Sequence, residues 1–232
     1  MKKNVDVVSV GLILDGNRRW AAQNGLGKLE GHKEGVKTVL SSIDWARDFG
    51  IQHVTFYAFS TENWNRSKLE VEALLMLFES MFSEQMDLVL EKKVSVKFVG
   101  SLHMFPKKLQ QSMKSIEEKT QNYEMCVYFA VSYGGRDEIV QAVKNVSKEL
   151  SEEQIASLSE KEFEVYLQSG GVPDPQIIIR TGGDKRLSNF LLWKSAYAEL
   201  FFINTLWPDF SKEELSAIVT EYRQKARINK GK

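Results

Sequence analysis

The chain has 232 residues, which is enough for one α/β domain with a substantial core. Lysine plus arginine and aspartate plus glutamate both number 31, and this balance excludes an overall field that attracts nucleic acid. One cysteine excludes an intrachain disulfide, and one cysteine with three scattered histidines argues against a zinc site.

Predicted strands and helices alternate along the chain. Six short runs rich in β-branched and aromatic residues are typical of strands, and helical apolar spacing lies between them. Nearly continuous apolar strands predict a mainly parallel sheet covered on both faces. The fold class is therefore α/β: a single domain over residues 1–232 with a six-stranded sheet flanked by helices. The predicted strands cover residues 7–14, 53–59, 94–99, 125–131, 176–180 and 199–203, and the predicted helices cover residues 33–49, 69–92, 106–122, 136–150, 161–168 and 212–227.

The predicted helix over residues 69–92 is apolar over more than one face. One interpretation is a helix buried on two sides. The other is a helix that lines an apolar cavity, with Met76, Met81 and Met86 as an adaptable wall. The single cysteine, Cys126, lies in another apolar run and is predicted to be a core thiol. The run over residues 7–14 is too short for a membrane span or a signal, so we expect a soluble cytoplasmic protein.

The segment that follows the strand 176–180 is suited to binding an anion. Arg180, Arg186 and Ser188 flank a Gly-Gly turn at residues 182–183. Ligands of open α/β sheets bind where strands end, glycine lets backbone N–H groups approach an anion, and arginine pairs with phosphate oxygens in a bidentate manner. The segment predicts a phosphate site.

A second site of this kind follows the first predicted strand. Asp15 is followed by Gly16 and Asn17, which tolerate unusual backbone angles, and then by Arg18 and Arg19. A helix starting near Arg18 would direct its positive end to the same place. The aspartate could hold Mg²⁺ against a diphosphate, because Mg²⁺ takes one or two carboxylates and completes its shell with phosphate oxygens and water. The alternative is a turn with solvated arginines.

Two further features have both a functional and a structural interpretation. His32 could hydrogen-bond a phosphate or transfer a proton, or it could be a structural hydrogen bonder at a helix start. The loop over residues 59–66 combines polar side chains with two aromatics, which suits a ligand charged at one end and apolar at the other. Its Trp64 could instead pack on the core. Motifs of the P-loop, the dinucleotide-binding turn and the nucleophile elbow do not occur in the sequence.

In chain order, these segments resemble a known family, the cis-prenyltransferases, of which bacterial undecaprenyl diphosphate synthase is the best-known member. The resemblance spans residues 10–210, nearly the whole chain. The matching blocks are residues 14–21, 31–35, 57–66, 133–136, 180–193, 197–200 and 206–210.

The resemblance implies a transferase that adds isopentenyl diphosphate to an allylic diphosphate (farnesyl, geranyl or dimethylallyl) and forms a cis double bond. It further implies an apolar tunnel for the growing tail, Mg²⁺ as cofactor, a homodimer, no nucleic-acid partner, and peripheral membrane contact through the product. By similarity, Asp15, Asn63, Ser60 and His32 are catalytic, and Asp15 and Glu199 are metal ligands. The substrate-binding residues implied in the same way are Gly16, Asn17, Arg18, Arg19, Trp20, Lys28, His32, Phe59, Ser60, Thr61, Glu62, Trp64, Arg66, Glu70, Arg180, Arg186 and Ser188.

Departures from the family pattern leave other functions open. Arg18 stands where bacterial members commonly have glycine, and Lys28 replaces an arginine. The family's C-terminal arginine-rich segment, which ends in Phe-Gly-Gly, appears only as residues 223–231. A short-product or irregular-condensing paralogue of specialised terpenoid metabolism is therefore one alternative. A non-catalytic partner subunit that binds prenyl diphosphate is another, although the retained Asp15, Arg180 and Ser188 argue against it.

Overall fold

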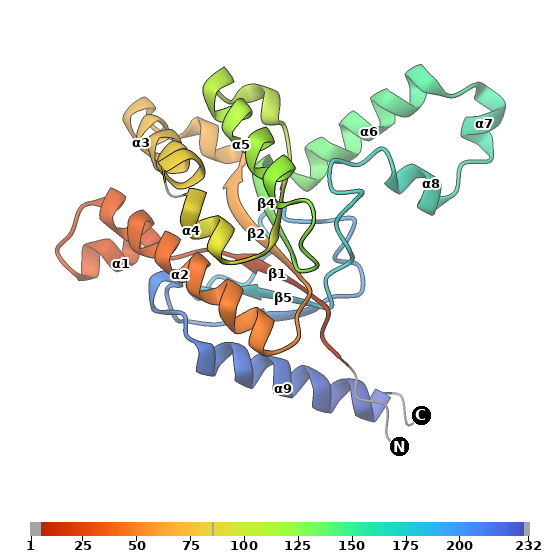
Figure 1. Cartoon of the computed structure of the whole chain (residues 1–232). Helices are drawn as coiled ribbons and strands as arrows, with labels where there is room; N and C mark the ends of the chain where they lie inside the picture. Colours follow the sequence, from red (N-terminus) through yellow and green to blue (C-terminus); the bar gives the residue numbers. More distant parts are fainter. Residues whose placement is uncertain (1–5, 85, 230–232) are drawn as a thin grey trace.

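Six strands form one parallel sheet in the order β3-β4-β2-β1-β5-β6 in the computed structural model, which describes residues 6–84 and 86–229 (Figure 1). All six predicted strands are confirmed, with ends that differ by no more than two residues. Buried parallel strands give this strong signal because both of their faces are apolar. The strands are β1 Ser9–Ile13, β2 His53–Ser60, β3 Ser95–Val99, β4 Cys126–Tyr133, β5 Ile177–Arg180 and β6 Glu199–Phe202.

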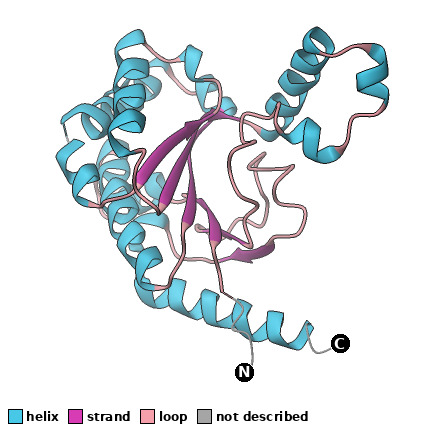
Figure 2. Cartoon of the chain, turned by 45° about the vertical axis from the view of Figure 1, so that its right-hand side comes forward, coloured by secondary structure: helices cyan, strands magenta, loops and turns pink. Residues whose placement is uncertain are grey.

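The two faces of the sheet are covered differently (Figure 2). One face packs against helices through a large apolar cluster that includes Val39, Phe78, Met113 and Ile218. The other face packs mainly against irregular chain, through Phe190 and other residues of a smaller cluster. Both faces are covered, as predicted, but helices form the main cover of one face only. The longer helices are α2 Lys28–Asp48, α3 Lys68–Glu79, α5 Lys107–Thr120, α6 Gly135–Glu149 and α9 Lys212–Asn229.

Helix α2 begins five residues before the predicted start, and a short helix, α1 Asn17–Gln23, packs against it. The predicted start was wrong because Gly31, which disfavours helix, lies within the first turns of α2. A Cβ at Gly31 would lie 2.1 Å from the backbone oxygen of Asn17, and one at Gly35 would lie 2.2 Å from Asn17 Oδ1. The glycines therefore allow close contact between α1 and α2, and this contact fixes the segment that follows Asp15.

The single helix predicted over residues 69–92 is divided in three. Helix α3 gives way to a π-helical turn, η2 Ser80–Glu84, and then to α4 Met86–Glu91. The turn Ser80–Glu84 contains neither glycine nor proline, so the sequence gives no indication of the break. Val71, Leu74 and Phe78 are the buried residues of α3, whereas Met76 is 69% exposed. Met76 is therefore not part of an internal wall, and the side chain of Met86 lies outside the described part of the chain.

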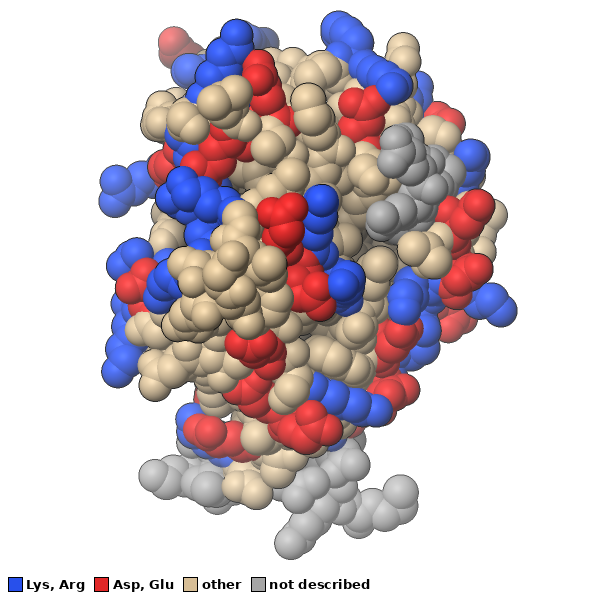
Figure 3. Space-filling view, turned by 90° about the vertical axis from the view of Figure 1, so that its left-hand side faces the viewer, with Lys and Arg blue, Asp and Glu red and all other residues tan. Residues whose placement is uncertain are grey.

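Helix α6 and the short helices α7 Glu152–Ala156 and α8 Glu160–Glu164 form an arm that stands away from the sheet (Figures 1 and 2). Charges of both signs are interspersed on the face shown in Figure 3, in keeping with the balanced composition. No helix in the described ranges combines the length and apolarity needed to cross a membrane. Cys126 begins β4 and is only partly buried, so it lies at the margin of the core and not inside it.

Candidate active site

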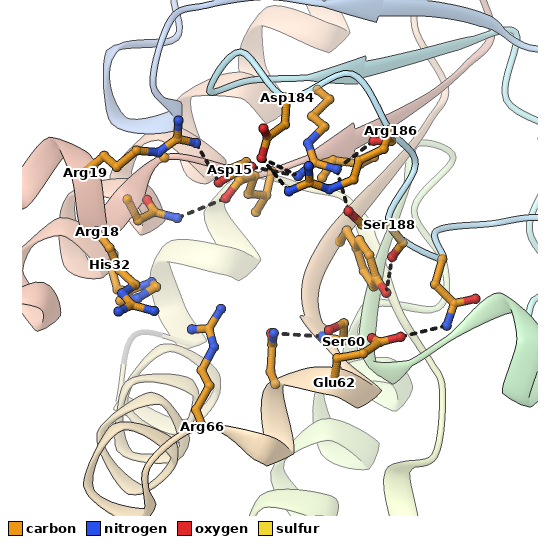
Figure 4. Close-up of a pocket in the computed structure, with 18 residues that line it drawn as sticks. Asp15, Arg18, Arg19, His32, Ser60, Glu62, Arg66, Asp184, Arg186 and Ser188 are labelled. Atoms are coloured by element: carbon orange, nitrogen blue, oxygen red, sulfur yellow. Dashed lines mark hydrogen bonds and ion pairs between the residues drawn. The ribbon is translucent and has the colours of Figure 1, made fainter.

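A cleft of about 730 Å³ lies where β1, β2 and β5 end (Figure 4). The parallel register places Ile13 beside both Tyr57 and Arg180, so the segments that follow these residues converge at one edge of the sheet. This is the edge at which α/β sheets bind ligands. Among the described residues, five arginines and three carboxylates line the cleft, which leaves an excess of positive charge.

Asp15 lies between two arginines. Arg19 Nη2 is 3.0 Å from Asp15 Oδ1, and Arg180 Nη2 is 2.8 Å from Asp15 Oδ2. The backbone oxygen of Asp15 accepts hydrogen bonds from Thr181 Oγ1 at 2.6 Å and from the N–H of Trp207 at 3.0 Å. The carboxylate is therefore fixed in position and partly exposed in the cleft, with positive charge on both sides.

The turn beside Asp15 requires glycine. Gly182 has φ 83°, and a Cβ there would lie 2.5 Å from Arg19 Nη2. Its carbonyl accepts a hydrogen bond from Arg19 Nη1 at 2.6 Å. Gly182 thus brings the loop after β5 against the loop after β1, so the two predicted anion sites share one cleft.

Arg180 organises the loop after β5. It is 4% exposed, and its Nη1 donates to the backbone oxygen of Arg186 at 2.6 Å and to Ser188 Oγ at 2.5 Å. Arg186 is 62% exposed at its side chain and pairs with Asp184 at 2.6 Å. Arg180 is therefore buried and organises the loop, whereas Arg186 is largely exposed and lines the cleft paired with Asp184.

A second group of cations surrounds one carboxylate, Glu70. Its Oε1 is 3.0 Å from Arg66 Nη1 and 3.5 Å from Arg18 Nη1, and its Oε2 is 3.9 Å from Lys28 Nζ. Arg18 and Arg66 line the cleft, whereas Glu70 and Lys28 are not among the residues that line it. Figure 4 shows Arg18, His32 and Arg66 together on one side of the cleft, with Arg186 and Ser188 across from them.

His32 lies in the second turn of α2 and borders the cleft. Its pKa is lowered from 6.5 to about 4, mainly by burial and also by the nearby charges of Arg66 and Arg18, while the charge of Glu70 acts in the opposite direction. His32 is therefore neutral near pH 7. Its buried Nε2 has no partner among the described residues, so it is free to bond a ligand atom.

We expect His32→Asn to reduce the acid sensitivity of folding. Because the pKa of His32 is lower in the folded chain, the unfolded chain binds the extra proton between about pH 6.5 and about pH 4. The free energy of unfolding therefore falls as pH decreases through this range, by up to about 3 kcal/mol. Urea titrations of both proteins across the range measure the difference. If the free energy of unfolding changed with pH by the same amount in wild type and variant, the lowered pKa of His32 would be contradicted.

The far wall of the cleft follows β2. Ser60 and Asn63 belong to a capping box at the start of the short helix η1 Thr61–Asn65, and the N–H of Ser60 donates to Asn63 Oδ1 at 3.1 Å. Tyr57 Oη donates to the backbone oxygens of Tyr133 and Ser188 at 3.1 and 3.2 Å. Burial raises the pKa of Tyr57, as does the charge of Glu62, so its hydroxyl stays a donor.

An apolar cavity of about 130 Å³ adjoins the cleft. Leu14, Asn17, His32, Tyr57 and others line both spaces, so the two share a boundary. Further in, the cavity is lined by Leu74, Leu77, Phe78 and Met81, which come from α3 and the turn that follows it. This supports the cavity-lining interpretation of this segment and places Met81, but not Met76, in the wall.

The structure divides the predicted site residues into two groups. Thirteen line the cleft: Asp15, Gly16, Asn17, Arg18, Arg19, His32, Ser60, Glu62, Asn63, Arg66, Arg180, Arg186 and Ser188. The described residues Trp20, Lys28, Phe59, Thr61, Trp64, Glu70 and Glu199 are not among those that line it.

Three residues of the second group have structural partners instead. Trp20 Nε1 donates to Asp209 Oδ1 at 2.7 Å, and Trp64 Nε1 donates to Ser132 Oγ at 2.9 Å. Phe59 is 1% exposed and packs against Trp64. These contacts favour the structural interpretation of both aromatics in the 59–66 loop.

Glu199 lies at the opposite edge of the sheet from Asp15. It pairs in register with Ile177, the first residue of β5, whereas the cleft lies beyond Arg180, the last. Its carboxylate is 3.4 Å from Lys225 Nζ of α9. Within one chain, therefore, Glu199 does not lie beside Asp15, and its role as a metal ligand stays a prediction.

Sequence reasoning missed five lining residues. They are Ile13, Leu14, Tyr57, Asp184 and Asn189. Ile13 and Leu14 lie at the end of β1, so position alone could have indicated them, whereas Tyr57 lies inside β2, three residues before its end. Asp184 and Asn189 lie within the quoted 180–193 block, but nothing in the pattern distinguishes them from loop residues.

Comparison with known proteins identifies the family. A family model described as "Putative undecaprenyl diphosphate synthase" matches residues 13–229. The chain belongs to this prenyltransferase family. Its Asp15, Arg180 and Ser188 thus lie in a cleft of a cis-prenyltransferase.

Individual relatives are similar in sequence to this chain over almost its full length. An isoprenyl transferase of Thermotoga maritima is 42% identical over 219 residues, 94% of each chain. A tritrans,polycis-undecaprenyl-diphosphate synthase (geranylgeranyl-diphosphate specific) of Thermoplasma acidophilum is 40% identical over 223 residues, which cover 94% of this chain and 86% of the relative.

Solved structures give the same fold. Lavandulyl diphosphate synthase from Lavandula x intermedia, in complex with dimethylallyl diphosphate, has a TM-score of 0.88 and 32% identity over 95% of this chain and 97% of its own. A probable undecaprenyl diphosphate synthase from Campylobacter jejuni has a TM-score of 0.77 and 32% identity over 94% and 95%.

Proposed function

We propose that the cleft binds an allylic diphosphate and isopentenyl diphosphate on either side of Asp15 and joins them into a cis-prenyl diphosphate. The observation that carries this proposal is the arrangement of two arginine groups about one carboxylate, beside an apolar cavity. Diphosphates need the arginines, and prenyl tails need the apolar space.

The allylic diphosphate occupies the Arg18, Arg19 and Arg66 side in this proposal. That side adjoins the apolar cavity through Arg66, His32 and Asn17, so the tail can enter the cavity while the diphosphate stays among the arginines. Cleavage of the allylic carbon–oxygen bond leaves charge on the diphosphate, and fixed cations stabilise that charge. Neutral His32 can donate one hydrogen bond to the leaving group.

Isopentenyl diphosphate occupies the Arg180, Arg186 and Ser188 side. The exposed Arg186 can exchange its ion pair with Asp184 for a phosphate, and Arg180 already holds Ser188 Oγ toward the same space. Ser60 and Asn63 lie on the opposite wall, where they can orient the substrates and assist loss of the proton after the new carbon–carbon bond forms.

Asp15 fits a magnesium ion that the family chemistry implies. Mg²⁺ accepts one carboxylate when phosphate oxygens and water complete its shell, and Asp15 is the carboxylate that lies between the two proposed diphosphates. Among described residues, no cluster of three or more acidic, histidine or cysteine side chains could hold a metal unaided. When bound, the ion would neutralise developing charge on the diphosphate leaving group.

The test is a diphosphate-release assay with both substrates and Mg²⁺, with each component omitted in turn. We expect release only when an allylic diphosphate, isopentenyl diphosphate and the metal are all present. Release from the allylic diphosphate alone would indicate a lyase or hydrolase. A protein that binds both substrates without release would be a non-catalytic partner subunit.

A short product is the second candidate, and the cavity volume favours it. The apolar space of about 130 Å³ equals only a few water volumes, at about 30 Å³ each, so a long tail requires α3 and its neighbours to move. We expect products sized after incubation with C5, C10 and C15 allylic diphosphates to end below C55. Efficient formation of C55 would contradict the short-product candidate and leave the condensation itself intact.

We expect a cytoplasmic homodimer that uses the arm and the β6 edge. Val140 and Val143 on α6 are 51% and 53% exposed, and Leu200 on the edge strand is 43% exposed. Val140 and Val143 are three residues apart and so share one face of α6, and grouped apolar side chains are typical of interfaces. Light scattering after size exclusion should give a dimer for wild type and a monomer for Val143→Glu. The matched control, Met76→Glu on α3, should stay dimeric, and a monomeric wild type would contradict the expectation.

A further inference from the structure

The loop that carries Ser188 holds an unusual backbone. Ser188, Asn189 and Leu191 have φ values of 49°, 68° and 44°. Left-handed backbone costs roughly 1 kcal/mol or more for residues other than glycine, although asparagine tolerates it better than most. Three such residues in four positions require strong contacts to hold them.

Apolar packing holds one side of this loop. Phe190 and Leu191 are fully buried, and the Phe190 ring stacks on Tyr57 at 4.7 Å between centroids. Packing anchors the loop to the sheet, but it does not fix how far Ser188 stands from the opposite wall of the cleft.

Asn189 supplies the polar contacts. Its Nδ2 donates to Glu62 Oε1 at 3.0 Å, and its Oδ1 accepts from the N–H of Arg136 at 2.8 Å. Its backbone oxygen accepts from the N–H of Gly135 at 2.7 Å. One asparagine therefore ties the Ser188 loop both to the start of α6 and to the helix η1.

Glu62 is suited to receive this bond as a carboxylate. Although burial acts in the opposite direction, hydrogen bonds from its own N–H, from Asn189, and from Ser60 and Thr61 lower its pKa. Glu62 stands on the wall that carries Ser60, opposite Ser188 (Figure 4). The Glu62–Asn189 bond thus joins the two walls across which the proposed substrates meet.

We propose that Glu62 and Asn189 form a latch that positions Ser188 and its partner Arg180 for isopentenyl diphosphate; this rests on the proposed function. In this role Glu62 is a positioning residue and not a substrate ligand, because its carboxylate is already occupied. The latch sets the spacing of the walls, so its loss weakens binding of isopentenyl diphosphate more than binding of the allylic substrate.

Exchange of the amide and carboxylate groups between positions 62 and 189 tests the latch. Asn189→Asp places two carboxylates against each other, and we expect the KM for isopentenyl diphosphate to rise roughly tenfold, the equivalent of one charge-assisted hydrogen bond. Adding Glu62→Gln restores the hydrogen bond with its direction reversed, because the amide at position 62 then donates to the carboxylate at position 189. The double variant should therefore recover most of the loss, with the allylic KM nearly constant throughout.

Three outcomes would overturn the latch. A double variant no better than Asn189→Asp would show that the side chains act independently. Equal rises in both KM values would show a general disturbance of the fold. Retention of the wild-type KM by Asn189→Gly, which keeps the left-handed backbone without the amide, would show that the side-chain bonds are dispensable. The Gly variant also serves if the Asp variant fails to fold.

Inorganic diphosphate separates this proposal from the proposed function. Diphosphate can bind at either arginine group, so calorimetric titration of wild type and of Arg186→Ala identifies the part of the binding that belongs to the Arg180 side, without any reaction. The latch predicts weaker binding in Asn189→Asp and recovery in the double variant even if the wild-type protein makes no prenyl product. Unchanged binding in Asn189→Asp would overturn the latch whether or not the enzyme turns over.

Discussion

We expect Asp15→Ala to lower kcat by about 10² or more, because it removes the carboxylate that lies between the two arginine groups. The backbone contacts of Asp15 with Thr181 and Trp207 do not involve its side chain, so the local fold should survive. Steady-state rates at saturating Mg²⁺, with a thermal melt of each protein, measure both expectations.

Asp184→Ala is the matched control for this experiment. Asp184 lines the same cleft and pairs with Arg180 and Arg186 at 3.4 and 2.6 Å, but it does not lie between the two arginine groups. Its loss should change kcat only a few-fold, on the scale of a partly exposed ion pair. If both variants lost activity equally, the effect would be general electrostatics and not a specific role of Asp15.

We expect Arg180→Ala to be far more damaging than Arg186→Ala. Arg180 is buried and binds Asp15, Ser188 and the backbone of Arg186, so its removal leaves partly buried groups unpaired at a cost of about 3 kcal/mol or more. It should raise the KM for isopentenyl diphosphate, lower kcat through Asp15, and lower the melting temperature.

Arg186→Ala should affect binding alone. Its exposed side chain contributes one charge-assisted contact of roughly 1.5 kcal/mol or more, so the KM for isopentenyl diphosphate should rise about tenfold with kcat nearly unchanged. A rise in the allylic KM instead, with the isopentenyl KM fixed, would mean that the two substrate sides are reversed.

The sequence predicts the sheet because its strands are buried on both faces. Ile177, Ile178 and Ile179 alternate between the two sides of the sheet, and both sides are apolar. The strand therefore appears in the sequence as an uninterrupted apolar run. The polar residues that follow these strands could be interpreted as one site, because the carboxyl ends of parallel strands lie at the same edge of the sheet.

Tertiary contacts determine what the sequence could not reveal. The start of α2 depends on the fit of two glycines against Asn17. Trp20 and Trp64 look like ligand aromatics in sequence but are held by Asp209 and Ser132, residues distant along the chain. Asn189 acts through a left-handed backbone and a bond to Glu62, and neither has a local sequence signal.

The most direct measurement is identification of the product formed from labelled isopentenyl diphosphate and an allylic diphosphate. The account predicts an allylic chain extended by whole C5 units, each new double bond cis by NMR, and no such product from Asp15→Ala. A product with trans geometry, or extension that persists at the wild-type rate in Asp15→Ala, would contradict the assignment of this cleft as a cis-prenyltransferase active site.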